Sequence, residues 1–480
     1  MPGLTRTRNT AWLTGCRIAG DLLNLLLFVV ISRQFGPAGV GVYSYSFAVA
    51  TFAFVIGCLG IEEYGLRQYA RLDSAERSGF LGELLGTQTL MVAAAVIGLA
   101  AYLALTRPSP ATLIMVGALG VYQITAAIVA TLFIPAMAEQ RMLWPALAQL
   151  AARTVAFAAA GCAIHFAHAP LALALLGFPP AAVIWLSLAI RSTRHYLPLL
   201  RLTVSWAATR RILAILWSFA LLEIFAQLFA RVGVIVLSLA VGDAAAGLFA
   251  TGLRLIEVAL MPLSFLGVAA YPGLSQLFAT DVPAFRRSAV DLVWIMLFGG
   301  GAVAWGLYFV APSLLVPVLG QRFAGAEPVI QTMAVFALVQ AVAVALGRLL
   351  LCADRQTANA AFVAAGAILS VILNVLLVPR YGVNGAIYAG AAAYAAIDVL
   401  CIGALRQPLT GAALRRMLVS LGASLAVGGG LAALLAMRGF SAWPQAIASV
   451  AGFIVIGAVA YRYRHGGAAR GLGTRPWSTS

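Results

Sequence analysis

The stretch CRIAGDLLNLLLFVVISRQFGPAGVGVY, residues 16–43, decides the fold class, because a cation, an anion and an amide lie inside a strongly apolar run. A helix needs about 20 mostly apolar residues to cross a bilayer. The run that begins at Ala11 reaches this length and is too long for the core of a signal peptide. We therefore expect a retained membrane span that carries Arg17, Asp21 and Asn24 on one helical face.

The rest of the chain continues this pattern. Of its 480 residues, 62% are hydrophobic and 10% are charged, and the mean hydropathy is +0.98, which excludes an ordinary soluble globular protein. We predict an all-α polytopic membrane protein of about fourteen transmembrane helices, with short Gly/Pro turns between them. The predicted spans are 11–32, 41–62, 80–105, 111–137, 145–164, 171–190, 212–239, 245–271, 289–311, 328–351, 358–378, 383–404, 414–436 and 443–461.

The arginines set the expected orientation. All 31 basic residues are arginine, and an N-terminus in the cytoplasm places twenty-two of them on the cytoplasmic side. The five on the other side are Arg33, Arg107, Arg322, Arg380 and Arg438. This bias predicts a multi-pass protein of the cytoplasmic (inner) membrane with both termini in the cytoplasm, whose basic side faces the anionic leaflet. Because the arginines are spread over turns between spans, nucleic acid is not an expected partner. The remaining four arginines fall inside spans.

A short internal repeat suggests two similar halves. GPAGVGVY at 36–43 is echoed by GDAAAGLF at 242–249, at an offset of 206 residues. The same offset carries Arg17 onto Glu223 and Asp21 onto Gln227. We predict two six-helix lobes related by pseudo-symmetry around a central cavity, a common transporter plan, plus two C-terminal helices. The expected boundaries are 1–190 and 212–404 for the lobes, 191–211 for a cytoplasmic linker, and 405–480 for the added helices and a basic cytoplasmic tail.

Charged and amide side chains inside the spans are the candidate functional residues. A charge at the centre of a span costs about 2.5–3.5 kcal/mol on insertion scales, so such groups pair with one another or face a wet cavity. The candidates are Arg17, Asp21 and Asn24 in the first span, Arg153 alone in the fifth, Glu223, Gln227 and Arg231 in the seventh, and Arg254 and Glu257 in the eighth.

Two interpretations of these residues remain open. In the first, Arg17–Asp21 and Arg254–Glu257 are pairs within single helices that neutralise each other. In the second, Arg231 and Arg254, at similar depth on consecutive spans, hold an anion such as a phosphate between them, which the guanidinium fork suits. The second predicts substrate-binding roles for Arg17, Asn24, Arg153, Arg231 and Arg254. It predicts proton or cation coupling for Asp21, Glu223 and Glu257.

The sequence lacks the residues that several classes of function require. The chain has no lysine, which excludes a Walker A loop and Schiff-base chemistry, and it has no HExxH motif, nucleophile elbow or Gly-rich phosphate loop. The five cysteines lie within or beside apolar runs, so we expect free thiols rather than disulfides or a metal cluster. We expect no enzyme activity, no cofactor and no metal. The class of function that remains is transport driven by an ion gradient or by the substrate gradient.

The sequence resembles a known family. Its opening matches a first span that ends in Ser32-Arg33, followed by Phe35-Gly36-Pro37, then Gly41 and Tyr43, and after the second span a basic turn with Arg67 and Arg71. AAYPGLSQLF at 269–278 and LNVLLVPRYGVNGAIYA at 373–389 match later turns. With these motifs in order, the chain is similar to the polysaccharide-exporting flippases of the multidrug/oligosaccharidyl-lipid/polysaccharide exporter superfamily.

The resemblance implies a function. Members of that family have two six-helix lobes around a cationic cavity that rock between inward- and outward-open states. Their substrates are lipid-linked oligosaccharides built on undecaprenyl diphosphate, for lipopolysaccharide or exopolysaccharide assembly, with a polysaccharide polymerase and other assembly proteins as possible partners. Arg17, Arg231 and Arg254 lie in spans that line the cavity of such proteins. The alternatives are a cation-coupled multidrug antiporter of the same superfamily and a non-transporting scaffold of an assembly complex.

Overall fold

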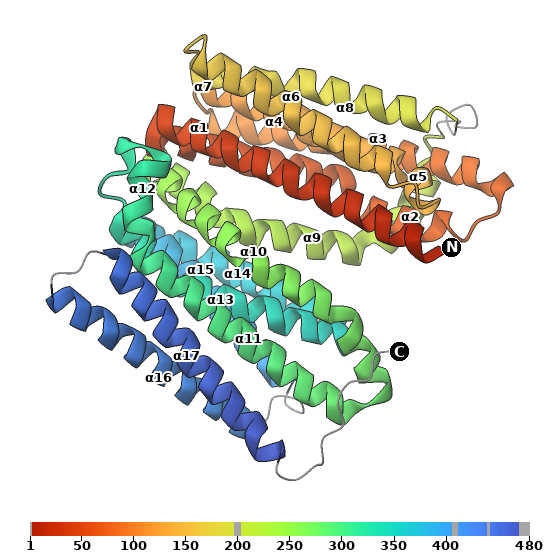
Figure 1. Ribbon diagram of the computed structural model, residues 1–480. Helices are drawn as coiled ribbons and strands as arrows, with labels where there is room; N and C mark the ends of the chain where they lie inside the picture. Colours follow the sequence, from red (N-terminus) through yellow and green to blue (C-terminus); the bar gives the residue numbers. More distant parts are fainter. Residues whose placement is uncertain (1, 196–202, 406–410, 439–441, 470–480) are drawn as a thin grey trace. The chain divides into compact units, whose positions relative to one another are not determined.

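The computed structural model describes residues 2–195, 203–405, 411–438 and 442–469 (Figure 1). These residues form helices joined by short turns, with no strand among them, which confirms the predicted all-α class. Parts of the predicted linker (196–202), of the segment before the added helices (406–410) and of the basic tail (470–480) lie outside the described residues.

The helices follow one another closely along the chain. The first half contains α1 (Pro2–Cys58), α2 (Ile61–Tyr69), α3 (Ser74–Thr106), α4 (Pro110–Leu132), α5 (Ile134–Ala138), α6 (Leu143–His165), α7 (Leu171–Ala174), the 3₁₀ turn η1 (Leu175–Gly177), α8 (Phe178–Thr193) and α9 (Trp206–Ala240). The second half contains α10 (Asp243–Thr280), α11 (Val282–Phe309), α12 (Ala311–Leu319), the 3₁₀ turn η3 (Gln321–Phe323), α13 (Glu327–Cys352), α14 (Gln356–Tyr381), α15 (Val383–Ala404), α16 (Gly411–Met437) and α17 (Ala442–Ala469).

Twelve helical segments of the described chain are long and apolar enough to cross a membrane. The first of them, Thr14–Tyr69, has 56 residues and is long enough for two spans. A shorter apolar segment, Ile447–Val459, lies in α17, where the last span is predicted. Together these segments match the predicted series of about fourteen spans, and the protein is a multi-pass membrane protein.

The first two predicted spans are not separated by a loop. They follow each other directly in α1, as two helical stretches joined by a kink at Gly36, where φ is 67° and ψ is −164°. Pro37 follows inside the helix, and a proline leaves the carbonyl one turn earlier without its helical hydrogen bond. The predicted FGPAG turn is therefore a kink. The predicted span 111–137 is also interrupted, because α4 ends at Leu132 and Pro135 lies in the first turn of the short helix α5.

The contacts divide the described chain into two units. The first unit is Met1–Leu248 with Val318–Arg322, and the second is Phe249–Pro317 with Phe323–Ser480. The predicted lobe boundaries stay a prediction.

In the first unit, small residues allow the helices to approach closely. Ala148, Ala152, Ala156 and Ala160 form a buried stripe along α6, at a spacing of four residues. Part of this stripe packs with α4 and α8 in a core that includes Phe133. The stripe therefore brings α6 close to its neighbours at the level of Arg153.

In the second unit, glycines have the same role. A Cβ on Gly300 of α11 would lie 2.5 Å from Ala341 of α13, and one on Gly366 of α14 would lie 2.4 Å from Ile397 of α15. Helices α11, α13, α14 and α15 therefore pack closely, and α16 and α17 pack on each other and, through α17, on α11.

Candidate functional site

The two segments of the sequence repeat contact each other within the first unit. A Cβ on Gly41 would lie 1.7 Å from the carbonyl oxygen of Asp243, and a Cβ on Gly247 would lie 1.8 Å from the carbonyl oxygen of Pro37. Pro37 and Asp243 are equivalent in the repeat, as are Gly41 and Gly247. Each segment thus presents a glycine to the carbonyl of its counterpart, and only glycine fits at either position.

A second set of contacts holds the bend of α1. Arg33 Nε donates to the carbonyl oxygen of Val318 at 2.9 Å, and Arg322 Nη1 donates to the carbonyl oxygen of Gln34. We call these two hydrogen bonds the arginine clasp. Both arginines are among the five predicted on the outer side, so the sequence alone gave them no role in packing.

Asp21 forms an ion pair that differs from the predicted one. Arg153 Nη1 of α6 donates to Asp21 Oδ1 of α1 at 2.7 Å, and the two side chains are 20% and 34% exposed. The interpretation in which Arg17 pairs with Asp21 was wrong, and Arg153, the one charged residue of the predicted fifth span, pairs with a residue of another helix. Gly20 explains the difference, because a Cβ there would lie 2.6 Å from Arg153 Cδ. The missing side chain opens the path by which Arg153 reaches α1.

The other polar residues of the first span have different surroundings. Arg17 is exposed, and no ion pair of Arg17 occurs among the described residues. Asn24 is half-buried on the same helix. The structure therefore leaves the guanidinium of Arg17 without a carboxylate partner in the described part of the chain.

The seventh span holds its polar residues differently. In α9, Gln227 Nε2 donates to Glu223 Oε1 at 2.9 Å, one turn away on the same helix. Arg231 places its guanidinium carbon 5.0 Å from the ring centroid of Phe47 in α1, which is cation–π geometry. Arg231 thus joins α9 to the helix that carries Arg17 and Asp21.

Arg254 and Glu257 belong to the second unit. Arg254 Nη1 donates to Glu257 Oε2 at 3.0 Å within α10, which confirms the predicted pairing within one helix. The side chain of Arg254 is 29% exposed and that of Glu257 is 57% exposed. Because Arg231 lies in the first unit and Arg254 in the second, a joint site for both stays a prediction.

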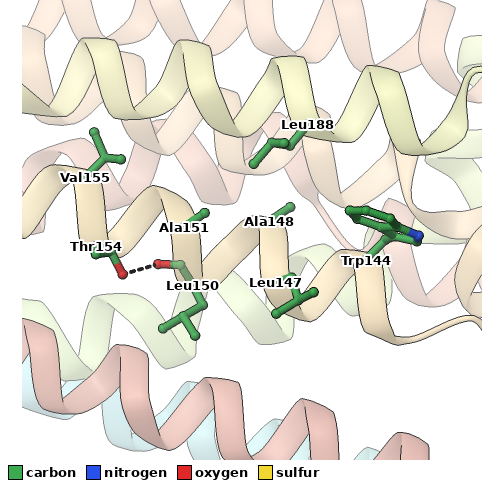
Figure 2. A pocket seen from close by; sticks show the side chains of 8 residues that line it. All are labelled: Trp144, Leu147, Ala148, Leu150, Ala151, Thr154, Val155 and Leu188. Carbon is green, nitrogen blue, oxygen red and sulfur yellow. Dashed lines mark hydrogen bonds between the residues drawn. The ribbon is translucent and has the colours of Figure 1, made fainter.

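A groove on the first unit lies away from these residues. It has a volume of about 460 Å³ between α6 and α8 (Figure 2). It is lined by Trp144, Leu147, Ala148, Leu150, Ala151, Thr154, Val155 and Leu188. Its one hydroxyl, on Thr154, donates to the carbonyl oxygen of Leu150 at 2.8 Å. Because residues turn by about 100° along a helix, Arg153 lies on another side of α6, and the groove contains none of the predicted site residues.

Asp398 is a buried acid that the charge spacing in the sequence did not indicate. This residue lies in α15, within a predicted span, and is 8% exposed. The signal was present in the sequence, since an acid in an apolar run is a candidate functional residue by default. Asp398 was missed because it has no charged neighbour one helical turn away.

Known proteins of this architecture are transporters and flippases by their titles. The structure of a lipid II flippase, MurJ, in an inward closed conformation is 13% identical, with a TM-score of 0.72, over 94% of this chain and 99% of that one. An inward-facing multidrug resistance MATE family transporter is 11% identical, with a TM-score of 0.62, over 82% of this chain and 96% of that one. The MATE multidrug transporter DinF-BH in complex with R6G is 16% identical, with a TM-score of 0.53, over 85% and 96%. At these identities the likeness shows the fold alone.

The sequence comparisons show the family. No curated protein sequence matches the chain significantly. The family model described as "Polysaccharide biosynthesis protein" matches residues 6–278, which is more than half of the 480 residues and includes the kinked helix and both repeat segments. The chain therefore belongs to the polysaccharide biosynthesis protein family.

Proposed function

We propose that this protein is a flippase that moves a lipid-linked oligosaccharide of the undecaprenyl diphosphate type across the cytoplasmic membrane by alternating access, for cell-surface polysaccharide assembly. Both termini lie in the cytoplasm in this proposal. The family membership supports it, and so does the likeness in fold to a protein whose title is lipid II flippase. During transport the lipid tail of the substrate stays in the bilayer, and its charged headgroup with the sugar passes through the protein.

The observation that carries the proposal is the state of the arginines inside the apolar helices. Arg17 has no carboxylate partner among the described residues, Arg231 lies on an aromatic ring, and Arg254 has a carboxylate partner that is more than half exposed. The guanidinium of Arg17 therefore keeps N–H donors for a ligand. Phosphate oxygens match the guanidinium fork better than any neutral sugar group does.

The proposed roles follow from these contacts. Arg17, Arg231 and Arg254 bind the diphosphate, and Asn24 adds a hydrogen bond beside Arg17. Arg153 is held by Asp21, and protonation of the Asp21 carboxylate would remove the charge that holds it. Arg153 would then turn toward the headgroup, which couples one proton to substrate binding. Glu223 and Glu257, each of which accepts one hydrogen bond, are further candidates for ion coupling.

A cation-coupled multidrug antiporter is the second candidate. The matches to multidrug transporters in fold favour it, one of them a complex with R6G. An antiporter of cationic drugs needs acids in its binding site, and an arginine there would repel the drug. The two functions therefore differ in what removal of the arginines does.

The test is a leaflet-accessibility assay of the lipid-linked oligosaccharide in cells that depend on this protein. Replacing Arg231 and Arg254 together by alanine should abolish appearance of the sugar in the outer leaflet. Arg107→Ala is the matched control, because Arg107 is an exposed residue that ends α3. Normal outer-leaflet sugar in the double variant would contradict a flippase and favour a scaffold. Loss of drug efflux with normal sugar export after depletion would favour the antiporter.

A further inference from the structure

Asp398 is a buried acid that the proposed transport roles do not use. It is 8% exposed in α15, and its Oδ1 atom has no hydrogen-bond partner among the described residues. None of the ion pairs in that part of the chain includes it. A carboxylate buried away from water without a partner is strongly unfavourable, so the group must be neutralised in another way.

The same holds for an oxygen on the neighbouring helix. Gln340 Oε1 of α13 is buried and has no partner among the described residues. Phe336, one turn before Gln340, packs edge-to-face on Tyr394, one turn before Asp398, with ring centroids 5.3 Å apart. Because residues four apart share a helix face, Gln340 faces α15 and Asp398 faces α13.

The two residues also lie at the same level of the bundle. At one end, a Cβ on Gly390 of α15 would lie 2.4 Å from the ring of Phe336. Further along, a Cβ on Gly347 of α13 would lie 3.4 Å from Asn359 of α14, and one on Gly366 would lie 2.4 Å from Ile397. Since α14 returns antiparallel to α15, these contacts make α13 and α15 parallel and place Gln340 opposite Asp398.

The charged and titratable groups around Asp398 do not neutralise it. On its own helix the nearest titratable groups are Tyr394 and Cys401. Glu257 of α10, which pairs with Arg254, places a negative charge near Tyr394. On α14 the charged residue is Arg380, near the far end of the helix. On α13 the charged residues are Glu327, in the first turn, and Arg348, two turns beyond Gln340. Arg355 donates to the carbonyl oxygen of Ala404 at 2.7 Å, six residues beyond Asp398.

We propose that Asp398 and Gln340 form a proton-binding site, in which the carboxyl group holds an exchangeable proton and donates it in a hydrogen bond to Gln340 Oε1. The step is simple: one proton adds to the carboxylate and the group becomes a neutral acid. The proton satisfies both unpaired oxygens at once. A hard cation such as Ca²⁺ needs six or more oxygen ligands, and the buried side chains described here supply two unpartnered oxygens. This site does not depend on which substrate the protein moves.

The test is labelling of the full-length protein in lipid nanodiscs with dicyclohexylcarbodiimide, which dissolves in the membrane and adds to protonated carboxyl groups. Peptide mass spectrometry then reads the modified residues as a function of pH. Asp398 should be labelled at pH 7.5. Asp281 is the internal control, because it is an exposed carboxylate that caps α11. Gln340→Leu should move the labelling of Asp398 to lower pH, because it removes the acceptor of the proton.

Three outcomes would overturn the proposal. In the first, Asp398 follows the same pH dependence as Asp281 in the unmodified protein, which needs no variant. In the second, Gln340→Leu leaves the pH dependence unchanged while Glu257→Gln, on α10, shifts it. In the third, sodium chloride suppresses the labelling of Asp398 relative to choline chloride at constant pH and ionic strength, which would identify a metal cation as the occupant.

Discussion

Residues 36–43 and 242–249 are equivalent in the sequence repeat, yet the chain passes through them differently. The first segment joins the two helical stretches of α1 directly through a kink at Gly36, while the second separates α9 from α10 at Gly242, where φ is 123°. At the second segment Ser238 Oγ donates to Asp243 Oδ1, and the acid lies in the first turn of α10, where a helix favours negative charge. The glycines Gly41 and Gly247 are nevertheless placed alike. What the repeat preserves is the close approach of two backbones, and the local backbone path is free to differ.

Alanine at either contact glycine should produce the largest effect. Gly41→Ala and Gly247→Ala each place a methyl group within 1.8 Å of a backbone carbonyl oxygen, so the segments must separate. We expect each to lower the free energy of unfolding by about 3 kcal/mol, the upper part of the range for overpacking. Thermal unfolding of the detergent-solubilised protein, followed by size-exclusion chromatography, measures this.

The control for these variants is Gly161→Ala in α6, where the added methyl would meet nothing within 4 Å. It should be neutral or raise the stability by up to about 1 kcal/mol, since alanine is the better helix former. Equal stability of Gly41→Ala and this control would mean that the contact between the repeat segments does not hold the unit together.

Alanine at Gly36, the glycine at the kink of α1, should have the next largest effect on stability. The backbone of Gly36, at φ 67° and ψ −164°, lies in a region that is essentially limited to glycine, and a Cβ there would lie 2.9 Å from Arg322 Cδ. We expect Gly36→Ala to cost about 2–3 kcal/mol. Gly242→Ala should cost less, because nothing lies within 4 Å of the added atom and only the positive φ opposes it. If Gly36→Ala and Gly242→Ala lower the thermal stability equally, the different backbone paths of the two segments do not contribute differently to stability.

Substitutions at Asp21 and Gln227, which are equivalent in the repeat, should differ next in their effect on stability. Asp21→Asn breaks an ion pair between two helices and should cost about 1.5–3 kcal/mol, the range for hydrogen bonds to charged groups. Gln227→Leu at the equivalent position loses only a bond within α9 and should cost about 0.5 kcal/mol. A double-mutant cycle of Asp21→Asn with Arg153→Leu isolates the pair. A coupling near zero in that cycle would refute the interhelical bridge as a stabilising contact.

Loss of the arginine clasp should have a smaller effect than loss of the Asp21–Arg153 ion pair, and only at the first segment. Arg322→Ala removes one hydrogen bond to the carbonyl oxygen of Gln34 and should lower stability by about 1 kcal/mol. Arg438→Ala is the comparison, because Arg438 is an exposed arginine that the sequence also places on the outer side. If both variants unfold at the same temperature, the clasp contributes nothing to the bend of α1.

Much of the fold could be predicted because hydrophobicity is a property of each segment by itself. The apolar runs gave the helices and their order, and the charge spacing in α10 gave the Arg254–Glu257 pair. The partner of Asp21 could not be predicted in this way. An intrahelical partner at Arg17 was available at the right spacing, but the absence of a side chain at Gly20 allowed a residue 132 positions away to bind instead.

The sequence by itself determined that this chain is a helical membrane protein with a repeat and with charges inside its spans, because the cost of burying charge in lipid and the gain from burying apolar surface are local quantities. Only the tertiary structure decided that a predicted turn is a kink, that the repeat glycines touch, and that Asp21 pairs with Arg153. These features depend on which surfaces meet, and small residues permit that approach without specifying the partner.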